Sequence, residues 1–95
     1  MDSDIDGIKR KILPILKRHN IRRVSLFGSV VRGDAGEDSD VDILVQIDED
    51  ISLLDFIGIK LEIEEALGRK VDLVEHSAIK PLLREKILSE LVEII

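Results

Sequence analysis

The sequence contains no cysteine, no tryptophan and no tyrosine, and its only aromatic residues are two phenylalanines. Without cysteine, the chain can form neither a disulfide framework nor a metal site built on thiolates. Without larger aromatic side chains, its core must be built from isoleucine, leucine and valine, which agrees with a hydrophobic content of 44%. A chain of 95 residues is expected to form a single domain over residues 1–95, with a modest core.

Long apolar runs and long basic runs are also missing. No stretch approaches the roughly 20 apolar residues that span a bilayer, and the acidic start Met1–Asp4 does not resemble a secretory signal. We therefore expect a cytoplasmic protein without membrane contact. The net charge is −6 and the longest basic tract is Lys9–Lys11, which argues against direct binding of nucleic acid. A nucleotide could still bind if metal cations accompany it.

Apolar periodicity and turn residues predict an α/β fold, in which helices flank a small mixed sheet of three strands. Pro14 is expected to kink or split the first helix, whereas Pro81 suits the first turn of the last helix. In that last helix, Leu82 and Leu83 are expected to form a buried stripe. The C-terminal run 91–95 is expected to pack on the sheet, with an interface to another chain as the alternative. The predicted helices are 3–19, 52–67 and 81–91, and the predicted strands are 24–27, 40–47 and 70–75.

Two aspartates, Asp40 and Asp42, stand directly before the apolar run 43–45. Because strand side chains alternate, both carboxylates are expected on one face, while the apolar residues of the strand point to the core. Two carboxylates so close together cannot both stay ionised unless a cation lies between them. Ligation by oxygen alone favours magnesium or manganese. An isolated Asp-x-Asp at the start of a strand is nevertheless more often a pair of solvated surface residues.

A Gly-Ser pair, Gly28–Ser29, follows the first predicted strand. Backbone N–H groups and a hydroxyl at such a turn can hold a phosphate group. Gly28 would let the backbone approach a ligand closely, and Ser29 is expected to cap a short helix while it donates to a phosphate oxygen. Taken alone, Gly-Ser is a common structural turn.

The two patterns together form one motif: Gly-Ser, ten residues, then Asp-x-Asp, from Gly28 to Asp42. This motif resembles the nucleotidyltransferase superfamily of polymerase-β type, and most closely its minimal nucleotidyltransferase branch. The segments "LFGS", "RG" and "SDVD" stand where that branch has them. The resemblance implies a palm-like fold and a third carboxylate on a later strand, and Asp72 in "GRKVDLVE" is the candidate. The ordinary alternative is that Asp72 is a solvated strand residue.

The resemblance also implies roles for particular residues. Arg32 would reach the triphosphate, although it could instead form a surface pair with Asp34 or Glu37. Asp34 and Asp38 are expected in a solvated loop and not among the ligands. Two Mg²⁺ ions and ATP are the implied cofactor and substrate. The implied catalytic residues and metal ligands are Asp40, Asp42 and Asp72, and the implied nucleotide-binding residues are Gly28, Ser29 and Arg32.

Members of the minimal branch commonly act as antitoxins that transfer AMP to a tyrosine of a HEPN-type ribonuclease toxin. The resemblance therefore implies such a toxin, encoded by the adjacent gene, as partner. The three predicted strands and the aliphatic C-terminus make a homodimer or a hetero-oligomer the expected assembly. Two alternatives stay open. The chain could neutralise its toxin by binding alone, or it could modify a small molecule of the aminoglycoside type, for which it lacks a second domain.

Overall fold

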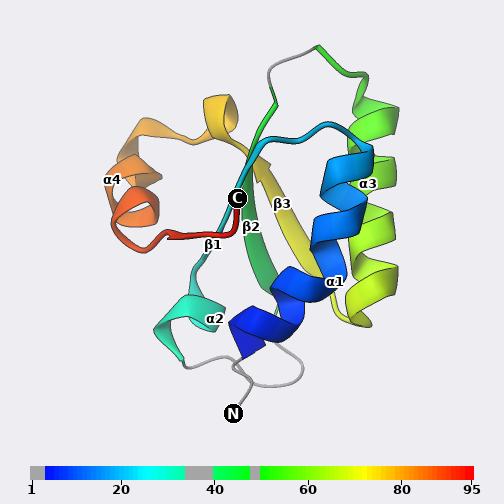
Figure 1. Ribbon diagram of the computed structural model, residues 1–95. Coiled ribbons are helices and arrows are strands. Elements are labelled where there is room, and N and C mark those ends of the chain that lie inside the picture. The colour runs from blue at the N-terminus through cyan, green and yellow to red at the C-terminus, as the bar shows by residue number, and fades with distance from the viewer. Residues whose placement is uncertain (1–3, 34–39, 48–49) are drawn as a thin grey trace.

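The computed structural model describes residues 4–33, 40–47 and 50–95, and it contains every helix and strand that the sequence predicts (Figure 1). Their bounds differ from the predicted ones by a few residues at most. In chain order, the elements are α1 (Asp4–Arg18), β1 (Arg23–Phe27), α2 (Ser29–Arg32), β2 (Val41–Gln46), α3 (Leu53–Leu67), β3 (Val71–Glu75), the 3₁₀ helix η1 (His76–Ala78), α4 (Pro81–Ser89) and β4 (Val92–Glu93).

The sheet is mixed and has the strand order β3-β2-β1-β4. Strand β1 is antiparallel to β2 and to β4, whereas β2 and β3 are parallel. The prediction of three strands was therefore wrong, because the two residues of β4 pair with Ser25 and Leu26 at the edge of the sheet. The expectation that the C-terminal run packs on the sheet is confirmed, since Ile94 is buried in the main core.

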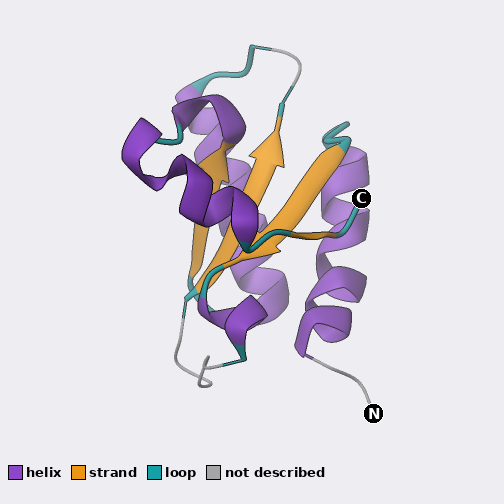
Figure 2. Cartoon of the chain, turned by 90° about the vertical axis from the view of Figure 1, so that its left-hand side faces the viewer, coloured by secondary structure: helices purple, strands orange, loops and turns teal. Residues whose placement is uncertain are grey.

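Helices cover both faces of the sheet: α1 and α3 lie on one side and α4 on the other (Figure 1). The larger core lies on the α1–α3 side and contains the alternate strand residues Val41, Ile43 and Val45. Leu44 points the other way and belongs to a smaller core under α4. Figure 2 shows helix α4 in front of the strands. The alternation predicted for β2 is thus confirmed, and it directs Asp42 to the α4 side.

Local sequence signals account for the helix ends. The Ser52 hydroxyl accepts a hydrogen bond from the backbone N–H of Asp55 at 3.1 Å, and Gly68 ends α3 in the left-handed conformation with a φ of 65°. Helix α1 runs through Pro14 without dividing, so of the two predicted effects of Pro14, a kink or a split, the split does not occur. Pro14 is exposed, and water can therefore satisfy the carbonyl that lacks an amide partner. The predicted start near Ser3 lies outside the described residues.

The predicted burial of Leu82 and Leu83 was wrong. These two side chains at the start of α4 are 96% and 50% exposed. The helix packs instead through Ile87, which contacts the smaller core. Consequently the first turn of α4 presents its leucines to solvent.

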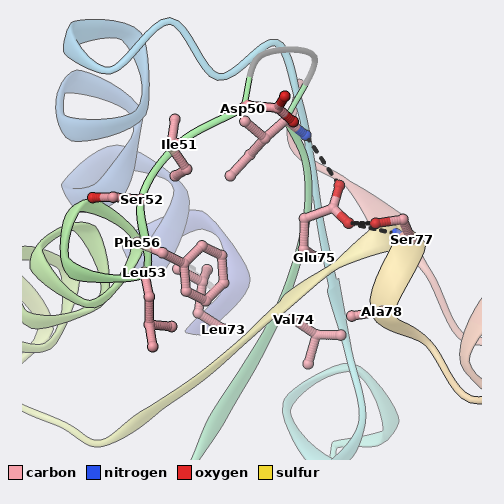
Figure 3. A pocket seen from close by; sticks show the side chains of 11 residues that line it. Asp50, Ile51, Ser52, Leu53, Phe56, Leu73, Val74, Glu75, Ser77 and Ala78 are labelled. Atoms are coloured by element: carbon pink, nitrogen blue, oxygen red, sulfur yellow. Dashed lines mark hydrogen bonds between the residues drawn. The ribbon is translucent and has the colours of Figure 1, made fainter.

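Glu75 connects the end of β3 to η1 and to the end of β2 (Figure 3). Its carboxylate accepts hydrogen bonds from the backbone N–H of Ser77 at 2.6 Å, from the Ser77 hydroxyl, and from the backbone N–H of Ile47 at 3.5 Å. Burial alone would raise the pKa of Glu75, but these hydrogen bonds outweigh burial and lower that pKa. The charged form therefore stabilises the fold above the pKa that Glu75 has in the unfolded chain, and this stabilisation is lost as the pH falls through the folded pKa.

We predict that Glu75→Gln lowers the free energy of unfolding near neutral pH by about 0.5–1 kcal/mol, because a charged acceptor open to solvent becomes a neutral one. The difference between the two proteins should shrink once the pH falls below the ordinary glutamate value of about 4.3. Urea denaturation of both proteins, near neutral pH and in acid, measures this difference in the free energy of unfolding. An equal difference at both pH values would show that the Glu75 charge has no such role.

Candidate active site

Asp42 and Asp72 lie side by side on the two parallel strands, since they are register partners between β2 and β3. Neighbouring strands are about 4.8 Å apart, so the two side chains leave the sheet close together. Alternation directs both of them to the α4 side. Asp42 is half-buried and Asp72 is exposed. Asp40 is exposed and directly precedes β2, one residue outside the strand in which the sequence placed it.

Gly28 brings the backbone against the Asp42 side chain. Phe27, the residue before it, is the register partner of Asp42 on β1. A Cβ atom at Gly28 would lie 3.0 Å from Cγ of Asp42 and closer still to Oδ2. Gly28 also has a φ of 76° and a ψ of −149°, a conformation that only glycine adopts readily. The glycine of the sequence motif is therefore required by the position of Asp42.

Ser29 is the first residue of α2, and Gly28 occupies the N-cap position without a side-chain cap hydrogen bond. The predicted capping role of Ser29 was thus wrong, because the turn at Gly28 begins the helix one residue earlier. Ser29 is half-buried and adjoins the contact between Gly28 and Asp42. Its predicted role in nucleotide binding stays a prediction.

A cleft of about 400 Å³ lies between the sheet and α4, and its lining includes Gly28, Asp42 and Asp72. Ser29 and Asp40 are not among the lining residues. Asp42 and Asp72 provide acidic groups from the strands, whereas Lys86 of α4 and Lys80, the residue before that helix, provide basic groups. Arg32, which also lines the cleft, comes from α2. This combination can accommodate both a metal cation and a polyphosphate, because groups of both charges line one space.

A larger cleft, of about 530 Å³, lies at the opposite end of β2 and β3 (Figure 3). Its lining is mainly apolar, with Phe56, Leu73 and Val74 among the residues. Its Glu75 carboxylate already accepts hydrogen bonds from Ser77. Asp50 also lines this larger cleft, but Gly28, Asp42 and Asp72 do not, so we place the candidate active site in the smaller one.

Arg32 pairs with Glu90, the residue that caps the C-terminus of α4. Its Nη1 donates to Oε1 and Oε2 of Glu90 at 3.3 and 3.1 Å. The surface partners considered from the sequence, Asp34 and Glu37, lie outside the described residues. The sequence reading also missed Glu90, Lys80 and Lys86 as residues of the cleft. The helical spacing of Leu83, Lys86 and Glu90 indicates one shared face, but not which surface that face meets.

The electrostatics of the cleft favour a cation beside Asp42. Burial raises the pKa of Asp42, and the charges of Asp72 and Asp40 raise that pKa further, while Arg32 opposes them. The positive charge of Arg32 therefore does not offset the burial and the neighbouring negative charges that disfavour an ionised Asp42. Among the residues that the structure describes, no three histidine, aspartate or glutamate side chains lie close enough together to hold a metal ion. The metal-binding roles of Asp40, Asp42 and Asp72 stay predictions.

Comparison with known proteins gives a consistent result. Residues 10–95 match the family model described as polymerase beta nucleotidyltransferase. The chain is 48% identical over 92 residues to a Methanocaldococcus jannaschii protein provisionally named a protein adenylyltransferase, and the match covers 97% of this chain and 99% of the relative. It is 47% identical over 76 residues to the protein adenylyltransferase MntA of Thermococcus cleftensis, covering 80% of this chain and 77% of that one.

Solved structures confirm the fold. A structure described as a minimal nucleotidyltransferase is 42% identical and matches with a TM-score of 0.80, over 97% of this chain and 95% of that one. A chain from the complex of a tri-AMPylated HEPN toxin of Shewanella oneidensis with its MNT antitoxin has a TM-score of 0.74 at 20% identity, over 94% of this chain and 70% of that one. At such low identity, this second match shows the fold alone.

We predict that Gly28→Ala lowers the free energy of unfolding by about 2–4 kcal/mol, because the added methyl group meets Asp42 and the backbone conformation is unfavourable for alanine. Urea denaturation measures this cost.

Gly33→Ala is the matched control. Gly33 also has a positive φ, of 82°, but a Cβ there would meet no atom within 4 Å. Gly33→Ala should lower the free energy of unfolding by about 1–2 kcal/mol, which is the cost of the left-handed conformation alone. Equal losses in the two variants would show that Asp42 does not restrict position 28.

Proposed function

Because this chain belongs to the polymerase-β nucleotidyltransferase family, we propose that it is a magnesium-dependent protein adenylyltransferase. It transfers AMP from ATP to a tyrosine hydroxyl of a HEPN-type ribonuclease toxin, encoded by the adjacent gene, and so acts as the antitoxin in the cytoplasm. The observation that carries this proposal is the meeting of Gly28, Asp42 and Asp72 in one cleft. The names of the close relatives and the AMPylated toxin in the distant complex support it.

The residues present fit a divalent cation. Asp42 and Asp72 offer carboxylate oxygens, the ligands that Mg²⁺ prefers, and the raised pKa of Asp42 reflects burial and repulsion that a cation would offset. Asp40 stands close enough to contribute to that repulsion. When bound, magnesium would neutralise charge on the transferred phosphate and on the attacking oxygen.

The remaining residues position the two substrates. The backbone at Gly28 and the Ser29 hydroxyl would hold the terminal phosphates of ATP, and Arg32 would neutralise part of their charge. The acceptor hydroxyl oxygen attacks the α-phosphorus and forms a new P–O bond. The bond from the α-phosphorus to its leaving oxygen breaks, and pyrophosphate departs. Asp72, which is exposed and lines the cleft, would accept the hydroxyl proton.

We predict that Asp42→Asn abolishes transfer while it leaves the fold intact and more stable in the absence of metal, because the substitution removes a charge that burial, Asp72 and Asp40 all oppose. Intact mass spectrometry of the co-expressed partner measures AMP additions, and thermal unfolding in chelator measures stability. Asp50→Asn, an exposed position outside this cleft, is the matched control and should transfer AMP normally.

Two results would overturn the proposal. If the Asp42→Asn protein still modified its partner, Asp42 would not belong to the catalytic site. If the natural protein formed a stable, neutralising complex without any mass gain in its partner, it would act by binding alone.

A further inference from the structure

The first turn of α4 exposes two neighbouring leucines beside the candidate active site. Leu82 is 96% exposed, which makes it the most exposed large hydrophobic side chain among the residues that the structure describes, and Leu83 is 50% exposed. Single exposed leucines are common on protein surfaces and need no explanation. Leu82 and Leu83, in contrast, lie next to the candidate active site, because Leu83 lines the cleft that contains Asp42.

Apolar side chains of this segment line the cleft, and Leu82 adjoins one of them in the chain. Leu83 lines the cleft together with Ile79 and Ile87. Leu82 directly precedes Leu83 in the chain and lies one helical turn before Lys86, which also lines the cleft. A macromolecule that covers Leu82 would therefore also lie over the opening that leads to Asp42.

The charge of this segment differs from that of the rest of the chain. The net charge of the protein is −6, yet residues 80–86 contain three basic residues, Lys80, Arg84 and Lys86, and the single acid Glu85. Such a basic segment on an acidic protein attracts a surface of opposite charge. A partner that suits it has an apolar pocket rimmed by carboxylates.

We propose that residues 80–86 form the docking surface for the acceptor protein, with Leu82 inserted into an apolar pocket of that protein. This inference rests on the proposed function, because it assigns the surface that would present the acceptor hydroxyl to the cleft. We call residues 80–86 the α4 docking surface.

Helix α3 offers a second group of exposed leucines, but in the wrong place for an acceptor. Leu53 and Leu54 are 73% and 80% exposed. They belong to the helical layer on the other side of the sheet from α4 (Figure 1). An acceptor bound there would have the sheet between its hydroxyl and Asp42, so it could not react in this cleft.

The α4 docking surface is tested with Leu82→Asp, and Leu54→Asp is the control at another highly exposed leucine, on α3. Isothermal titration with the HEPN-type protein encoded by the adjacent gene measures the dissociation constant of each variant. We expect Leu82→Asp to raise it about tenfold or more and to leave the affinity for an ATP analogue with Mg²⁺ unchanged. Leu54→Asp should bind the partner like the natural protein.

A gain of affinity gives a second test that misfolding cannot imitate. Glu85 lies one turn after Leu82 and is exposed. Glu85→Lys should lower the dissociation constant severalfold, and the effect should fade at high salt, because screening weakens attraction between exposed charges.

The outcomes separate this inference from the proposed function. If the chain binds its partner but never modifies it, the proposed function fails, while the effect of Leu82→Asp on binding still decides the docking surface. If AMP is transferred and Leu82→Asp binds and reacts like the natural protein, the docking surface is wrong and the proposed function stands. A loss of binding in Leu54→Asp alone would place the partner on α3.

Discussion

The repulsion between Asp42 and Asp72 is the interaction on which the rest of this site depends. The parallel register of β2 and β3 sets the two carboxylates next to each other, and partial burial makes the charge on Asp42 more costly still. A fold that served stability alone would avoid such a pair. A bound cation and an anionic substrate, as proposed above, would balance the charge of this pair in a cleft that also contains basic groups.

Three segments of the fold support this pair. The turn at Gly28 fits the Asp42 carboxylate against the end of β1. Helix α2 carries Arg32, which the C-terminus of α4 holds through Glu90. Helix α4 also borders the cleft, which is lined by Lys86 of this helix and by Lys80, the residue before it. Because α4 bears the exposed leucines as well, one helix would serve both the proposed nucleotide site and the proposed docking of the acceptor.

Much of the arrangement could be predicted from local sequence, because its determinants lie within a few residues. Alternation in β2 directs Asp42 away from the core, and Ser52 and Gly68 mark the ends of α3. Features that depend on distant contacts could not be predicted. The strand β4 has only two residues, the orientation of α4 depends on the core beneath it, and Arg32 meets Glu90 across 58 positions of the chain. Among the described residues, Asp40, Asp42 and Asp72 do not lie close enough together to hold a metal ion, so their shared metal-binding role stays a prediction.

The most direct test is a crystal structure of the protein with Mn²⁺ and a non-hydrolysable ATP analogue, in which anomalous scattering locates the metal. We expect manganese on the carboxylates of Asp42 and Asp72, with the terminal phosphates of the nucleotide against Gly28 and Ser29. A nucleotide bound instead in the larger cleft near Phe56, with no manganese at Asp42, would contradict the assignment of the active site.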